Sequence, residues 1–100
     1  MDDFESISGQ VPFTLTADTV TAQQTATVLP EGIYSIINNT MYDARIKVGA
    51  TANDVTASTG RLVMPGNEVK QEVKKDEKIG VIGVGGSVTL DIIRIRARAW

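Results

Sequence analysis

Cysteine and histidine are both absent from this chain of 100 residues. Without cysteine, neither a disulfide framework nor a cysteine-ligated metal site is available. Without histidine, the chain lacks the commonest metal ligand and the commonest general base in proteins. We therefore expect a protein that is not an enzyme and that holds no cofactor and no metal.

Long apolar runs are also missing. No stretch approaches the roughly 20 apolar residues that a membrane-spanning helix needs. The first ten residues, MDDFESISGQ, lack the basic and apolar regions of a signal peptide. We therefore expect a protein that is made in the cytoplasm and has no membrane partner.

Charge of one sign is missing from each end of the chain. Residues 1–31 contain five acidic residues and no Lys or Arg, whereas the last nine residues contain three arginines and no acid. The net charge of −2 gives no overall attraction to nucleic acid, so no nucleic-acid partner is expected. An acidic start and a basic end can pair between neighbouring copies.

The second half of the chain is dominated by short apolar runs separated by turn residues. Residues 62–64, 69–73, 79–84 and 87–95 read as four strands. Pro65-Gly66 and the polar run 74–78 separate the first three, and Gly85-Gly86 predicts a two-residue hairpin before the last. A competing interpretation makes residues 67–75 a helix capped by Asn67, with Val69 and Val73 on one face.

The first half continues the same pattern. Strands are expected at 11–16, 20–29, 33–37 and 42–48, and Pro12 places the first at a sheet edge or a strand start. Residues 33–37 are apolar on both faces, which is typical of a central strand. The polar stretch 49–60 is the best candidate for a mobile or binding loop.

Seven to eight short strands predict an all-β protein, an antiparallel β-sandwich that is jelly-roll-like or Ig-like. We expect an acidic arm at residues 1–10, a sandwich domain at 11–93 and a basic tail at 94–100.

Most residues that could form a chemical site have a plainer interpretation. Gly80, Gly83, Gly85 and Gly86 have the wrong spacing for a phosphate-binding loop, so they indicate a hairpin and close strand packing. Asp91, between apolar neighbours, is expected to face water or to pair across the sheet. Asn38-Asn39-Thr40 fits an N-glycosylation acceptor. Tyr34, Tyr42 and Trp100 could form an aromatic platform but are more typical of a core or an interface.

The terminal segments carry the candidate partner contacts. Phe4 and Ile7 are the apolar anchors of the acidic arm. Arg94, Arg96, Arg98 and Trp100 share one parity, so an extended tail would present them along one side. Such a strand or arm could add to a neighbouring subunit, with Arg and Trp as anchors. The alternative is an edge strand whose charges prevent aggregation.

Five stretches in particular, GIYSIINNT, ARIKVG, TANDVTASTG, LVMPGNEVKQEV and SVTLDIIRI, form a pattern over residues 28–95. In this pattern the chain resembles the small β-sandwich accessory proteins of tailed bacteriophage virions. The resemblance implies a capsid decoration or cement protein of the virion, a homo-oligomer that binds the major capsid protein or other virion subunits. Two alternatives stay open: a neck, tail or fibre component, and a carbohydrate- or receptor-binding module that uses the 49–60 loop and the tyrosines.

Overall fold

The computed structural model describes residues 12–25 and 29–96, which form eight strands and no helix. The predicted all-β class and antiparallel sandwich are therefore confirmed. The strands are β1 (Phe13–Ala17), β2 (Gln23–Gln24), β3 (Gly32–Asn38), β4 (Asp43–Gly49), β5 (Arg61–Val63), β6 (Glu68–Val73), β7 (Lys78–Val84) and β8 (Val88–Arg96).

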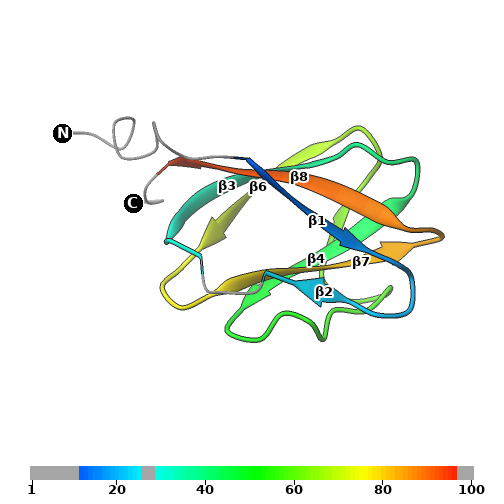
Figure 1. The fold of residues 1–100 in the computed structure, drawn as a ribbon, viewed down its shortest axis with the longest axis horizontal. Helices are drawn as coiled ribbons and strands as arrows, with labels where there is room; N and C mark the ends of the chain where they lie inside the picture. The colour runs from blue at the N-terminus through cyan, green and yellow to red at the C-terminus, as the bar shows by residue number, and fades with distance from the viewer. Residues whose placement is uncertain (1–11, 26–28, 97–100) are drawn as a thin grey trace.

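Two four-stranded antiparallel sheets make up the sandwich (Figure 1). We call them sheet A, with the order β1-β8-β3-β6, and sheet B, with the order β2-β7-β4-β5. Each strand of the first half pairs with its counterpart counted from the other end: β1 with β8, β2 with β7, β3 with β6 and β4 with β5. The chain is thus one long antiparallel hairpin with its tip at residues 50–60.

That hairpin is rolled up, so that β3 also pairs with β8 and β4 also pairs with β7. Eight strands connected in this way form a jelly roll. An Ig-type sandwich groups its strands differently, with A, B, E and D in one sheet. The pairing therefore decides between the two expected architectures in favour of the jelly roll.

Rolling the hairpin sends most connections from one sheet to the other. The predicted hairpin at Gly85-Gly86 is wrong for this reason, because β7 belongs to sheet B and β8 to sheet A. The local signal was sound, since Gly85 has a φ of 90° that suits a reversing glycine. A turn signal, however, specifies a reversal of direction and not the strand that will be the partner.

The other strand predictions agree with the structure in most respects. Residues 67–75 do not form a helix, because 68–73 are strand β6 with Val73 fully buried. β3 is a central strand and β1 is an edge strand, as expected. The strand predicted at 20–29 is reduced to Gln23–Gln24, and its predicted end at Val28 lies outside the described residues.

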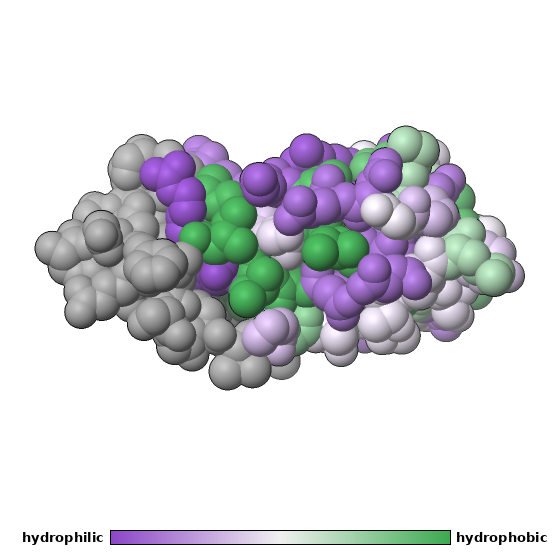
Figure 2. All heavy atoms as spheres, turned by 90° about the horizontal axis from the view of Figure 1, so that it is seen from above, coloured by the Kyte–Doolittle hydropathy of each residue, from purple (hydrophilic) through white to green (hydrophobic). Residues whose placement is uncertain are grey.

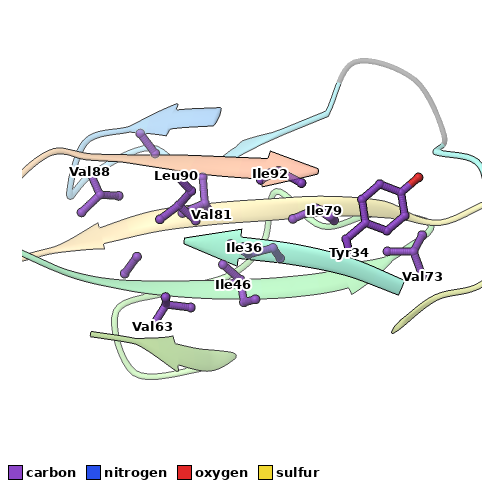
Figure 3. Close-up of a cluster of buried hydrophobic side chains, with 12 residues drawn as sticks. Tyr34, Ile36, Ile46, Val63, Val73, Ile79, Val81, Val88, Leu90 and Ile92 are labelled. Atoms are coloured by element: carbon purple, nitrogen blue, oxygen red, sulfur yellow. The ribbon is translucent and has the colours of Figure 1, made fainter. Parts of the chain in front are cut away.

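Inward-facing residues of both sheets form a single core between them (Figure 3). Each fully buried Ile, Leu or Val contributes roughly 1.5–3 kcal/mol relative to an exposed position. This burial selects the face that each strand turns inward. The core residues are Ala17, Tyr34, Ile36, Ala44, Ile46, Val63, Val73, Ile79, Val81, Val88, Leu90 and Ile92.

The 50–60 connection, which the sequence favoured as a mobile or binding loop, packs against the outside of sheet B. Ala52 and Val55 are buried. A Cβ atom at Gly80 would lie 1.8 Å from the carbonyl oxygen of Ala52, so the absence of a side chain there makes room for the connection. Lys47 also holds it, through an ion pair of 2.6 Å with Asp54. This connection is part of the packed body.

Candidate functional site

Four connections lie together at one end of the sandwich. β1, β3, β5 and β7 all end there, and β2, β4, β6 and β8 all begin there, since each strand is antiparallel to its neighbours. We call this the loop end; it is the right-hand end in Figure 1. Its connections are residues 18–22, 39–42, 64–67 and 85–87.

The loop end carries the exposed apolar side chains. Among the described residues, the large hydrophobic side chains with the greatest exposure are Val20 at 84%, Met41 at 77%, Met64 at 49% and Tyr42 at 40%, and all four lie in these connections. Leu62, at 38%, is in the adjoining strand β5. Figure 2 shows pale and green side chains reaching this end. The loop end is therefore where the exposed large apolar side chains of the described residues are concentrated.

Asn38, the last residue of β3, fixes two of the four connections. Its side chain is fully buried. The Nδ2 group donates to the carbonyl oxygens of Tyr42 at 2.7 Å and Val63 at 3.0 Å. The Oδ1 atom accepts from the backbone N–H of Thr40 at 3.0 Å and from the Thr40 hydroxyl. All four hydrogen-bonding positions of the amide are therefore occupied.

The backbone of Asn38 adds a second tie between the same connections. Its N–H donates to the carbonyl of Asn67 at 3.1 Å, and its carbonyl accepts from the N–H of Gly66 at 2.7 Å. Asn38 thereby joins residues 39–42 to residues 64–67. Hydrogen bonds to Asn38 thus hold the backbone on either side of Met41 and on either side of Met64.

Tyr42 and Asp18 fix the remaining two connections. A Cβ atom at Gly86 would lie 2.3 Å from Cε2 of Tyr42, so the ring packs directly on this glycine. The N–H of Gly83 donates to the carbonyl of Asp18 at 2.9 Å. The contacts thus link 64–67 to 39–42 and 39–42 to 85–87, and the end of β7 links to 18–22.

The Asp18 carboxylate shapes the turn that carries Val20. Its Oδ1 accepts from the N–H groups of Thr21 at 2.7 Å and Val20 at 2.9 Å. These two backbone hydrogen bonds lower the pKa of Asp18, because they stabilise the charged form. Asp18 is the only charged residue in the four connections, which contain no Lys or Arg. The four connections are therefore nearly uncharged, with a weakly acidic character.

The basic tail predicted from Arg94 onward begins inside the sandwich. β8 continues to Arg96, beyond the expected domain end at 93. Its pairing with β3 shifts by one residue, so that Arg94 is opposite Tyr34 and Arg96 is opposite Ile33. Paired residues share a face of the sheet, and Tyr34 and Ile33 face opposite ways. The expectation that Arg94 and Arg96 lie on one side is therefore wrong, because the β-bulge reverses the alternation.

Arg94 makes hydrogen bonds within its own chain. Its Nε and Nη2 atoms donate to the carbonyl oxygen of Glu31 at 3.1 and 2.6 Å. Burial raises the pKa of the Tyr34 phenol, and the positive charge of Arg94 partly offsets this effect. The Tyr34 hydroxyl donates to the carbonyl of Pro30 at 2.6 Å. Arg94 thus helps to hold the connection between β2 and β3.

Four of the six predicted contact residues, Phe4, Ile7, Arg98 and Trp100, lie outside the described residues. The other sequence candidates do not come together. Tyr34 is buried near the start of β3, whereas Tyr42 follows the end of that strand. The glycosylation pattern is explained by the fold, since Asn38 is buried with its amide fully engaged. Asp91 accepts a hydrogen bond from Asn39 rather than from a basic residue.

Neither a metal site nor a membrane span is found in the described ranges. Residues 12–25 and 29–96 contain no group of three or more carboxylates that could hold a metal ion. The same ranges include no helix of the length and apolarity needed to cross a bilayer.

The sequence missed the residues that build the loop end. The sequence indicates a glycosylation acceptor at Asn38 and a strand that begins at Val20, and it predicts no role for Met41. One signal was present in the sequence: Met41 follows Asn38-Asn39-Thr40 and precedes the strand expected at 42–48, so this apolar side chain has no expected strand face to occupy. No protein-family model matches the chain, and the search of curated proteins found no match.

Proposed function

We propose that this protein is a structural component of a virus particle, a decoration or cement protein that binds a repeated protein surface of the capsid. The proposal combines the jelly-roll body with the pattern resemblance to accessory proteins of tailed bacteriophages. The observation that carries it is the position of the exposed apolar side chains. Val20, Met41, Tyr42 and Met64 lie on three of the four connections at one end of the sandwich.

Binding through the loop end needs little reorganisation of the protein. Buried Asn38 and the packing of Tyr42 on Gly86 hold the connections in place before a partner arrives. A preorganised surface loses less conformational entropy on association, so more of the contact energy contributes to affinity. The decorated state of the capsid is then stabilised by mass action, because the protein binds the intact surface and not the opened one.

The chemistry of the loop end favours a protein partner. An anionic polymer such as nucleic acid is bound mainly by Lys and Arg, and the four connections contain neither. Apolar side chains on a rigid support, with aromatic and methionine residues among them, are typical of protein–protein interfaces. In this proposal the protein is made in the host cytoplasm and then resides in the virion.

Cosedimentation with phage heads assembled from candidate major capsid proteins tests the proposal. We expect saturable binding with a fixed number of copies per head, together with a higher temperature of head opening. The double variant Val20→Asp/Met41→Asp should lose at least about tenfold in affinity, because it places two charges in the apolar contact.

A matched control places the same charges on the connection that packs outside sheet B. Thr51 and Ala57 are exposed residues of the 50–60 connection, and Thr51→Asp/Ala57→Asp should bind like the wild-type protein. Equal losses in both double variants, or the absence of any head binding, would count against the proposal. Binding confined to isolated necks, tails or fibres would support the neck, tail or fibre alternative.

The carbohydrate- or receptor-binding alternative receives no comparable support. Its expected residues were the tyrosines and the 49–60 loop. Tyr34 is buried, and Ala52 and Val55 pack the loop onto sheet B.

A further inference from the structure

The edges of the two sheets differ in how they are closed. Sheet A ends at β1 and β6, and sheet B ends at β2 and β5. An edge strand presents unpaired backbone N–H and C=O groups that can pair with another chain. Natural proteins close such edges with charges, bulges, very short strands or covering side chains. Three of these four edges are closed in one of these ways.

The β6 edge is closed by side chains and charge. Nη1 of Arg61 donates to the carbonyl of Lys70 at 2.9 Å, and Nε2 of Gln71 donates to the carbonyl of Glu72 at 3.1 Å. Outward positions of β6 alternate between Glu68, Lys70 and Glu72. An incoming strand would have to displace these hydrogen bonds and meet these charges.

The edges of sheet B are protected because their edge strands are very short. β2 has two residues and β5 has three. So few residues offer an incoming strand only one or two hydrogen bonds.

β1 has none of these protections in the described part of the chain. Its five residues, FTLTA, include no charge, and its pairing with β8 is regular. Alternate residues of an edge strand direct their N–H and C=O groups away from the sheet. Pro12 limits the strand at its start but removes no donor within it.

We propose that β1 pairs with β1 of a second copy of this chain, antiparallel, across a two-fold axis at Leu15. The pairing joins the two copies of sheet A into one continuous eight-stranded sheet. Such an interface is isologous, so each contact occurs twice. The proposal does not depend on the loop end or on the proposed function.

The sequence of β1 is self-complementary in this register. On the outer face, Thr14 lies opposite Thr16 of the second copy, and Thr–Thr pairs across strands are favourable. The same pairing already occurs within the chain, where the hydroxyls of Thr16 and Thr89 lie 2.9 Å apart. On the inner face, the half-buried Leu15 lies opposite Leu15 of the second copy. The absence of charge removes like-charge repulsion, which a two-fold axis would otherwise impose on a charged strand.

Analytical ultracentrifugation of the purified chain over a range of concentrations tests this pairing. We expect a reversible monomer–dimer equilibrium. In Thr14→Lys/Thr16→Lys, lysines of the two copies face each other, so the dissociation constant should rise about tenfold or more. An equimolar mixture with Thr14→Asp/Thr16→Asp should restore dimers, because the mixed pair has opposite charges at the same positions.

Two further measurements test whether β1 itself forms the dimer contact. The variant Thr51→Lys/Ser58→Lys adds the same charge to exposed residues of the 50–60 connection and should dimerise like the wild-type chain. Amide hydrogen exchange of residues 13–17 should slow as the protein concentration rises. A wild-type chain that stays monomeric at the highest concentration, or a dimer that the β1 charges leave unchanged, overturns the proposal.

Discussion

The side-chain amide of Asn38 donates a hydrogen bond to the backbone carbonyl of Val63, 3.0 Å away. This contact joins the last residue of β3 in sheet A to the last residue of β5 in sheet B. The two residues are 25 positions apart in the chain. A single buried amide therefore connects the two layers of the sandwich at the end where the exposed apolar side chains are found.

Replacing this amide should destabilise the whole fold. In Asn38→Ala, the carbonyls of Val63 and Tyr42 and the N–H of Thr40 lose their buried partners. Unsatisfied buried polar groups cost about 1–3 kcal/mol each, so we expect the free energy of unfolding to fall by about 2–4 kcal/mol. Urea denaturation measures this free energy of unfolding. The exposed neighbour provides the control: Asn39→Ala should cost less than about 1 kcal/mol, and equal losses in both variants would contradict the role of Asn38.

A side chain at Gly80 should displace the 50–60 connection. The added Cβ would lie 1.8 Å from the carbonyl oxygen of Ala52, which is backbone and cannot rotate away. Gly80→Ala should therefore lower the free energy of unfolding by about 1–3 kcal/mol. It should also speed amide exchange at Ala52, whose N–H donates to Oε1 of Gln24 at 2.9 Å.

The matched control for that variant is Gly49→Ala. There the nearest atom to an added Cβ is the carbonyl oxygen of Thr51 at 3.6 Å, an ordinary contact. We expect a change in stability within about 0.5 kcal/mol. If Gly80→Ala were as harmless as Gly49→Ala, the close packing of the connection on sheet B would be refuted.

Removing the charge of Arg94 should raise the pKa of Tyr34 further above its ordinary value. Burial already raises this pKa, and the nearby guanidinium opposes the shift by favouring the phenolate. Arg94→Ala removes the opposing effect. Alkaline absorbance titration in a Tyr42→Phe background isolates Tyr34, since the chain has two tyrosines. Arg96→Ala, one step beyond the bulge, should change the pKa less, and a pKa that falls in Arg94→Ala would exclude this arrangement.

The Asp18 carboxylate should make the loop end sensitive to acid. Its folded pKa is lower than the ordinary 3.8, so its contribution to stability is fully present above 3.8. The contribution is lost as pH falls through the lowered folded pKa. We therefore expect the difference in melting temperature between the wild-type chain and Asp18→Asn to be largest near neutral pH. The difference should shrink as the pH falls below 3.8, and a constant difference would contradict the assignment.

The sequence by itself determined where most strands lie and which faces the alternating strands bury. Alternation in ARIKVG and EVKQEV has a period of two, and a strand is the only regular structure that separates such residues into two faces. Turn residues such as Pro65-Gly66 mark the ends of strands, because their backbone preferences are local. Exposed Met41 could also have been noticed, since it follows a turn and belongs to no alternating run.

Only the tertiary structure decided which strands pair, which side Arg96 faces and where the apolar side chains gather. β7 and β8 are adjacent in sequence but lie in different sheets, because the chain folds as one long rolled hairpin. Arg96 changes face through a one-residue shift against β3. Val20, Met41 and Met64 lie at the same end only after eight strands have been placed. Each of these depends on contacts between residues far apart in the chain, and such contacts are selected by the packing of the whole core rather than by any local preference.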